Sequence, residues 1–250
     1  MWDNAPEWLD LLAKHPDLWF SFEVLDDLVM AVDTIRVAGV EERLLVPMGE
    51  RAAEQLRLTL EHSAQPNVRV LWGIFSHRPV LRPIAHLTYI CKEAAARDAG
   101  KAQRFMQLAH WLVTELNPND NHGLRIDLSN YLVKFERWEE VIALNERYPE
   151  DMQPHLRLNA LLAAFVIQRS GNLAQDFKQA VNDFPNAVKM LLGPQPKPVK
   201  PDHPYGITIG SKYEAWLYVL EMRSSWIQHH ALEWARALLS SNKKNVSVLP

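Results

Sequence analysis

Apolar residues recur with helical spacing through most of this 250-residue chain, and this periodicity restricts its fold more than any other feature. Leu25, Leu28, Val29 and Val32 follow the i, i+3, i+4, i+7 pattern of one helix face, with charged residues between them. Only residues 67–76 alternate in the manner of a strand, and one isolated strand cannot make a sheet. The sequence therefore predicts an all-α protein and leaves a strand, a buried helix or an extended connector open at 67–76.

From about residue 78 the apolar stripes fall into pairs that end at related prolines. Pro118, Pro149 and Pro185 each follow a stripe and lie 31 and 36 residues apart, close to the period of about 34 residues in tetratricopeptide-type repeats. Phe177, Ala180 and Pro185 reproduce the second half of that repeat's pattern, whereas its first half is absent. We therefore expect antiparallel helix pairs stacked as a short tetratricopeptide-like (TPR-like) solenoid.

The changes in pattern divide the chain into segments. Five prolines between residues 193 and 210 preclude a helix there and predict an extended, polyproline-type insert. Asn172 with Gln175, and Ser211 with Glu214, have the spacing of helix N-caps with a reciprocal partner. The predicted organisation is an N-terminal helical segment at 1–77, TPR-like helix pairs at 78–192, the insert at 193–210, a closing helix pair at 211–240 and a polar tail at 241–250.

Composition excludes several functional classes. The nine glycines have neither of the spacings that cradle phosphates, and the single Cys91 allows no internal disulfide and no Cys-rich zinc site. A net charge of −3 gives no overall attraction to nucleic acid or to anionic lipid. The N-terminus is acidic and no apolar stretch is long enough for a membrane span, so we expect a cytoplasmic protein without metal or cofactor.

One segment resembles a known group of proteins. Residues 116–125 read L-N-P-N-D-N-H-G-L-R and follow R-P-V-L-R at 78–82, and a later L-L-G at 191–193 precedes the proline-rich insert. This order resembles a largely uncharacterised family of TPR-like helical proteins with an L-N-P-N-D-N-x-G-L-R signature. The resemblance covers about residues 78–235 and departs from the family at 184–188 and 228–231. It implies a TPR-like fold and carries no catalytic residue.

Two arginines occupy equivalent places in successive repeats. Arg125 lies in G-L-R-I-D-L and Arg157 in H-L-R-L-N-A, each in the first helix of its pair. First helices of TPR-type pairs line a concave groove, where such positions form a ladder. The sequence thus predicts a partner-binding site that holds a carboxylate or acidic segment, or alternatively arginines that pair with neighbouring acids such as Asp127. The predicted site residues are Arg125, Asn130, Arg157 and Asn159.

These observations favour non-catalytic binding of another protein or peptide, as an adaptor or regulatory subunit, with a second copy of the chain able to extend a small groove. An alternative is a hydrolase whose groups converge only in three dimensions, drawn from His86, His110, His122 and His155. A further alternative is nucleic-acid binding along a basic run formed by Arg69, Arg78, Arg82 and Lys92, which the net charge disfavours.

Overall fold

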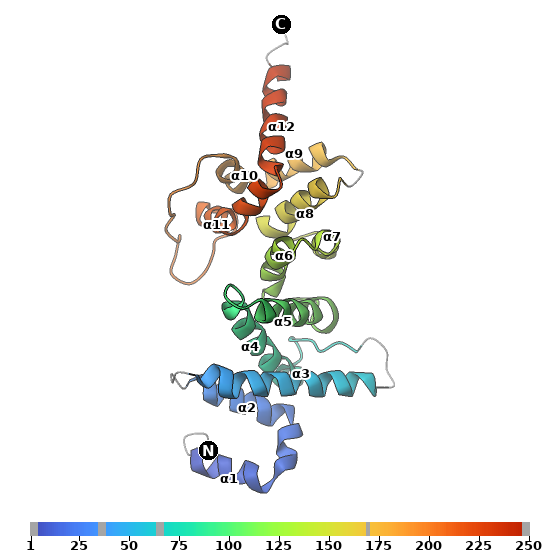
Figure 1. The fold of residues 1–250 in the computed structure, drawn as a ribbon, viewed down its shortest axis with the longest axis vertical. Coiled ribbons are helices and arrows are strands. Elements are labelled where there is room, and N and C mark those ends of the chain that lie inside the picture. The colour runs from blue at the N-terminus through green and yellow to red at the C-terminus, as the bar shows by residue number, and fades with distance from the viewer. Residues whose placement is uncertain (1–4, 35–38, 64–67, 169–170, 247–250) are drawn as a thin grey trace. The chain divides into compact units, whose positions relative to one another are not determined.

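A computed structural model describes residues 5–34, 39–63, 68–168 and 171–246, and within these ranges every regular element is helical, as expected (Figure 1). Short 3-10 or π turns at Pro16–Phe20, Glu41–Leu45, Phe75–His77 and Trp111–Leu116 adjoin some of the helices. The α-helices of the described residues are α1 (Ala5–Lys14), α2 (Phe22–Asp33), α3 (Val46–Glu61), α4 (Arg78–Ala94), α5 (Ala99–His110), α6 (Leu124–Lys134), α7 (Trp138–Arg147), α8 (Pro154–Val166), α9 (Leu173–Asp183), α10 (Pro185–Leu192), α11 (Lys212–Gln228) and α12 (Ala231–Val246).

The chain divides into two compact units, unit 1 at Met1–Leu124 and unit 2 at Arg125–Pro250. The division falls inside the segment 78–192, for which the sequence predicted continuous helix pairs. Each unit has its own buried apolar core.

Unit 1 is organised around α4, which packs against α2, α3 and α5. Leu81, Ile84 and Leu87 on α4 are almost completely buried. The crossing with α3 is close because Gly49 presents no side chain there: a Cβ atom at this position would lie 2.6 Å from the Leu87 Cβ and 3.1 Å from the Pro83 carbonyl oxygen. The backbones of α3 and α4 therefore meet at Gly49.

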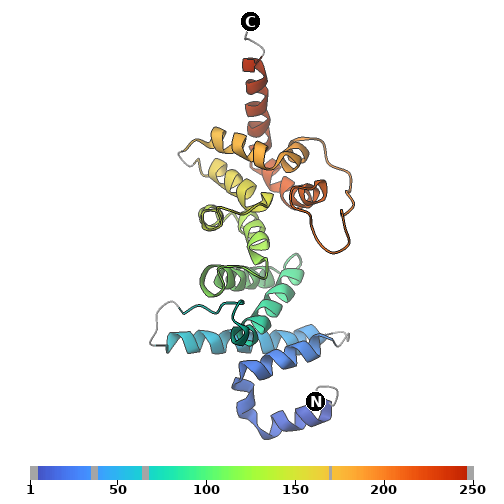
Figure 2. The ribbon, with the colours of Figure 1, turned by 180° about the vertical axis from the view of Figure 1, so that it is seen from behind.

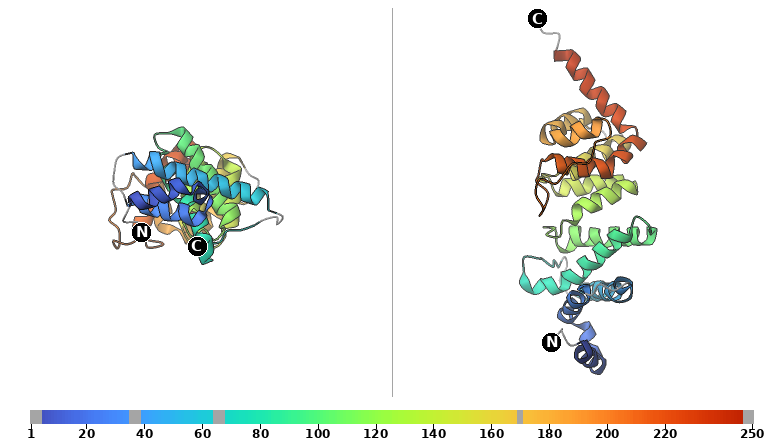
Figure 3. Two further views of the ribbon diagram at one scale, coloured as in Figure 1. Left: turned by 90° about the horizontal axis from the view of Figure 1, so that it is seen from below. Right: turned by 90° about the vertical axis from the view of Figure 1, so that its left-hand side faces the viewer.

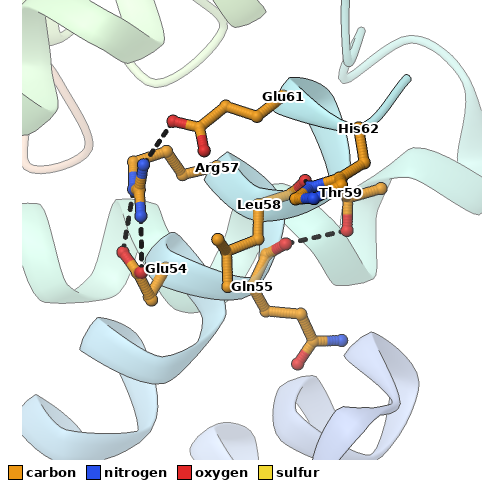
Figure 4. A network of polar contacts seen from close by, with 7 residues as sticks. All are labelled: Glu54, Gln55, Arg57, Leu58, Thr59, Glu61 and His62. Carbon is orange, nitrogen blue, oxygen red and sulfur yellow. Dashed lines mark hydrogen bonds and ion pairs between the residues drawn. The ribbon is translucent and has the colours of Figure 1, made fainter. Parts of the chain in front are cut away.

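The C-terminal half of α3 carries a solvent-exposed polar face (Figure 4). Arg57 pairs with Glu54, one turn earlier, and with Glu61, one turn later. The Thr59 hydroxyl donates to the Gln55 carbonyl oxygen at 2.7 Å, within the same helix. Such exposed ion pairs contribute little to stability, because water screens the two charges.

Unit 2 is organised around α8, which packs against α7, α9, α11 and α12. Its residues from Pro154 to Ala163 are buried except for Arg157, as expected for a helix that is apolar on all sides. Helix α10 packs against α11. Figure 2 and the right-hand view of Figure 3 show α12 continuing beyond its neighbours toward the C-terminus.

Several local predictions differ from the structure. Helix α9 ends at Asp183, before Phe184 and Pro185, as expected, but Pro185 also begins a further helix, α10, because proline at a first helical position lacks only an N–H that would be unpaired there. Asn172 precedes α9 without a side-chain capping bond, whereas the Ser211 cap is confirmed, its hydroxyl accepting from the Glu214 amide at 3.1 Å. The expected tail is helical to Val246, and residues 247–250 lie outside the described residues.

The open question at 67–76 is resolved in favour of a connector over the described residues 68–74. The Val70 amide donates to the Leu116 carbonyl oxygen at 3.0 Å, and the Trp72 amide donates to the Asn117 side-chain oxygen at 3.3 Å. Because these partners are one carbonyl of the turn Trp111–Leu116 and one side chain, residues 68–74 form no sheet.

Candidate functional site

Two of the predicted site residues, Asn130 and Asn159, belong to a buried polar network in unit 2. The Asn159 side-chain amide donates to the Asn130 side-chain oxygen at 2.8 Å and to the Ser129 hydroxyl at 2.9 Å. The Tyr218 hydroxyl donates to the Asn159 side-chain oxygen at 3.3 Å and accepts from the Trp226 indole N–H at 2.9 Å. Asn159 is fully buried and Asn130 is 2% exposed. The structure thus places both side chains inside unit 2, where they join α6, α8 and α11.

His155 extends this network along α8. Its ring meets the Tyr218 ring edge-on at a centroid distance of 5.2 Å, and its Nε2 lies 4.0 Å from the Glu221 carboxylate. The Asn130 amide donates to the same carboxylate. Burial lowers the pKa of His155 to about 4, because the charged imidazolium loses its hydration, although nearby Asp151 opposes the shift. His155 is therefore neutral at physiological pH.

Arg125 is held by an acidic side chain, as in the alternative interpretation, and the acid is Asp151. Its Nε donates to Asp151 Oδ2 at 2.5 Å, and its guanidinium lies over the Tyr148 ring at 5.6 Å. The other oxygen of Asp151 accepts from the Gln153 amide at 2.8 Å, immediately before α8. The Asp151 side chain is only 4% exposed. Arg125 thus stabilises the turn that starts α8.

Arg157, one of the four predicted residues, lines a cleft in unit 2. The cleft has a volume of about 320 Å³ and is bordered by α7, α8, Gly171 and the start of α9. Arg157 faces it because the remaining sides of α8 are committed to the core. The side chains that line the cleft with Arg157 are Ile142, Asn145, Glu146, Ala160, Leu161, Ala164, Leu173 and Asp176.

The cleft is lined by both a basic and two acidic side chains. Arg157 makes no hydrogen bond or ion pair with any residue that the structure describes, and the same holds for the Asp176 carboxylate. Glu146 adds a second acid at the α7 wall, and Leu161 and Ile142 supply apolar surface. The cleft can therefore accept an anionic group at Arg157 next to an apolar group, and it disfavours a second anion near its acidic walls.

The dispersed histidines of the hydrolase alternative lie in separate contacts. His86 faces Asp33 at 3.3 Å, the His110 ring faces the Thr114 hydroxyl at 3.3 Å, and His122 meets the Trp72 ring at 4.6 Å. Cys91 is buried, and burial raises the pKa of its thiol. Within the described ranges no group of three or more histidine, cysteine, aspartate or glutamate side chains is placed to hold a metal ion.

The N-P-N-D-N-H-G loop and the start of α4 form a cluster in unit 1 that the sequence did not predict. Arg78 donates from Nε to the Trp72 carbonyl oxygen at 3.1 Å and lies over the Trp72 ring. Arg82 lies over the same ring and pairs with Asp26 at 3.1 Å, and His122 meets the ring edge-on. Two arginines of the predicted basic run are thus engaged within the protein. The signal was the i, i+4 spacing in R-P-V-L-R, which puts both arginines on one helix face.

The comparisons with known proteins give no family for this chain: no family profile, no curated protein and no solved structure matches it. Among the described residues, no helix is both long enough and apolar enough to cross a membrane.

Proposed function

We propose that this chain is a TPR-like helical-repeat protein that binds another protein or peptide at the cleft of α7, α8 and α9. The observation that carries the proposal is Arg157, a cation without a partner among the described residues, beside the apolar side chains of the cleft. In this proposal α6–α7 and α8–α9 are successive repeat pairs. The protein acts as a cytoplasmic adaptor or regulatory subunit and not as an enzyme.

The lining of the cleft specifies the kind of peptide that fits. A volume of about 320 Å³ accommodates one or two side chains rather than a folded element. Arg157 would bind a carboxylate through paired hydrogen bonds, while Leu161 and Ile142 would contact a neighbouring apolar side chain. Glu146 and Asp176 favour a basic or neutral residue next to that pair. The proposed ligand is therefore a segment with a single acidic group beside an apolar residue.

The test is an affinity purification from the native host with quantitative mass spectrometry, using the wild-type chain, Arg157→Glu and Lys178→Glu as baits. Lys178 is exposed on α9 and does not line the cleft, so its reversal makes the same charge change outside the site. The Lys178→Glu bait is expected to recover a partner of the cleft as well as the wild type does. The Arg157→Glu bait is expected to recover at least tenfold less of it, since a charge-assisted contact contributes roughly 1.5–3 kcal/mol. Equal recovery of every partner by all three baits would refute the proposal.

A further inference from the structure

The proline-rich insert of unit 2 contains a three-residue repeat. Residues 197–205 read K-P-V, K-P-D and H-P-Y, so that a lysine or histidine precedes a proline three times in succession. A polyproline II helix has three residues per turn, and each proline fixes its own φ near the value this helix requires. Residues 195–201 lie in neither a helix nor a turn, whereas residues 202–206 form bends and a turn. The polyproline II conformation is therefore open to K-P-V-K-P at 197–201, where it places Lys197 and Lys200 on one edge.

The triplets are exposed along almost their whole length. Pro198, Pro201 and Pro204 are all exposed, and Tyr205 is 93% exposed, the highest value among the large hydrophobic side chains of the described residues. Between residues 197 and 205 the described contacts include only one hydrogen bond, a local one from the Tyr205 amide to the His203 ring. Figures 1 and 2 show this segment as a long loop that stands away from α10 and α11.

Both ends of the loop are fixed to unit 2. At the first end, Arg223 donates to the Gly193 carbonyl oxygen at 2.7 Å, and Arg236 donates to the Leu192 carbonyl oxygen at 2.9 and 3.0 Å. At the other end, the Asn186 amide donates to the Gly210 carbonyl oxygen at 2.8 Å, and the Gly210 amide donates to Glu214 at 2.7 Å. The loop therefore leaves and rejoins the helices at defined points.

The part of the insert before the triplets has a different environment. Gln195 and Pro196 border a depression of about 190 Å³ on α11, together with Trp216, Leu220 and Arg223. The triplets that follow are not among the residues of this depression. Residues 195–196 thus lie beside α11, whereas the triplets lie outside this depression.

We infer that residues 197–201, K-P-V-K-P, which precede the turn at Pro204 and Tyr205, are a recognition segment for a protein domain that reads polyproline II helices in an aromatic-lined groove with acidic residues along one wall. Prolines spaced by three residues, about 9 Å along such a helix, match grooves that accept successive X-Pro pairs. Lys197 and Lys200 outnumber the single acid Asp202, which gives the segment its preference for an acidic wall. Proline also restricts the backbone conformations of the unbound loop, so that binding costs less conformational entropy.

The experiment titrates the full chain against a panel of isolated SH3 and WW domains that carry acidic grooves, with binding followed by calorimetry. At least one domain is expected to bind the wild-type chain and to lose at least tenfold in affinity with the double variant Pro198→Ala, Pro201→Ala. The variant Lys197→Glu, Lys200→Glu is expected to weaken the same complex at least fivefold. Pro194→Ala, outside the triplets, is the matched control and leaves the affinity unchanged.

Two further measurements separate this inference from other causes. A synthetic peptide of residues 196–206 competes with the full chain for the same domain, which excludes an effect of misfolding. Arg157→Glu leaves this binding unchanged, so failure of the cleft proposal and failure of the loop proposal are distinguishable. The inference is overturned if no domain of the panel binds, or if the double-alanine variant binds as tightly as the wild type.

Discussion

At the scale of single residues, the same sequence context leads to different roles for the equivalent arginines. Arg125 pairs with the buried Asp151, whereas Arg157 faces a cleft without a partner among the described residues. The sequence could predict their equivalence because both follow Gly-Leu or His-Leu at the same place in a helix. It could not predict which acid would approach Arg125, because Asp151 lies 26 residues away, in a turn before the next helix.

The sequence around Asn159 indicates that this residue is buried. Residues 156–163 read L-R-L-N-A-L-L-A, which is apolar on nearly every side of a helix, and such helices are buried. A polar residue in that run is expected to be satisfied internally. The partners themselves, from α6 and α11, are distant in sequence and follow only from the packing.

Asn159→Leu tests the importance of this network. The substitution preserves approximate size but leaves the Asn130 oxygen and the Tyr218 hydroxyl without their buried partner. We expect the free energy of unfolding to fall by about 2–4 kcal/mol, measured by urea denaturation. Asn172→Ala is the control, because the exposed Asn172 side chain makes no capping bond, and its effect stays within about 0.5 kcal/mol. A leucine variant as stable as the wild type would contradict the role assigned to the network.

His155 makes unit 2 sensitive to acid. Its pKa is about 4 in the folded chain and 6.5 in the reference state, so the unfolded chain binds more protons between these values. Stability is therefore lost as the pH falls from about 6.5 to 4, by up to roughly 3 kcal/mol. His155→Leu should reduce this slope in denaturation curves recorded at several pH values. His203→Leu, in the exposed insert, should leave the slope as in the wild type.

At the scale of helices, local periodicity sufficed to predict the all-α class and most helix positions. The helices that begin near residues 78, 124 and 154 each coincide with an apolar stripe, and such a stripe can be recognised within a short stretch of the sequence. The end of α9 before Pro185 was predicted but the start of α10 at Pro185 was not, because proline is compatible both with the end of one helix and with the first turn of another. The choice depends on whether the following residues, Ala187, Val188 and Leu191, find a surface to bury against, here supplied by α11.

The crossing of α3 and α4 gives a prediction at this scale. Alanine has a higher helix propensity than glycine by about 1 kcal/mol, so Gly49→Ala would stabilise an isolated α3. In the protein its Cβ would lie 2.6 Å from the Leu87 Cβ, which forces the two helices apart. We expect a net loss of about 1–3 kcal/mol, measured by thermal and urea unfolding. At Gly73 a Cβ meets nothing within 4 Å, so Gly73→Ala should leave stability nearly unchanged.

At the scale of the whole molecule, two buried groups, Asp26 in unit 1 and His155 in unit 2, make contributions to stability that depend on pH in opposite directions. Burial raises the pKa of Asp26 in unit 1 to about 6 from 3.8, despite the opposing charge of Arg82. For Asp26 the folded chain binds more protons than the unfolded chain between these values, so its contribution to stability is lost as the pH rises from about 4 to 6. The His155 contribution in unit 2 is lost as the pH falls through a similar range.

Asp26→Asn is expected to stabilise the chain at pH 7.5 by roughly 1–2 kcal/mol, because the amide avoids the cost of burying a charge. The gain should shrink toward pH 4, where Asp26 is protonated in the wild type. Urea denaturation at both pH values measures the difference. Asp27→Asn, on the exposed side of α2, serves as the control and should show a much smaller gain. A gain that is equal at both pH values would contradict the assignment to Asp26.

The fixed ends of the proline-rich insert have a consequence for how the chain can be cut or extended. Gly193 and Gly210 are each held by side chains of the adjoining helices, so the path between them is not needed to keep those helices in place. New chain termini introduced near Gly206 should therefore be tolerated, as should a guest domain inserted there. The insert interrupts the sequence of unit 2 between α10 and α11, although these two helices pack directly against each other.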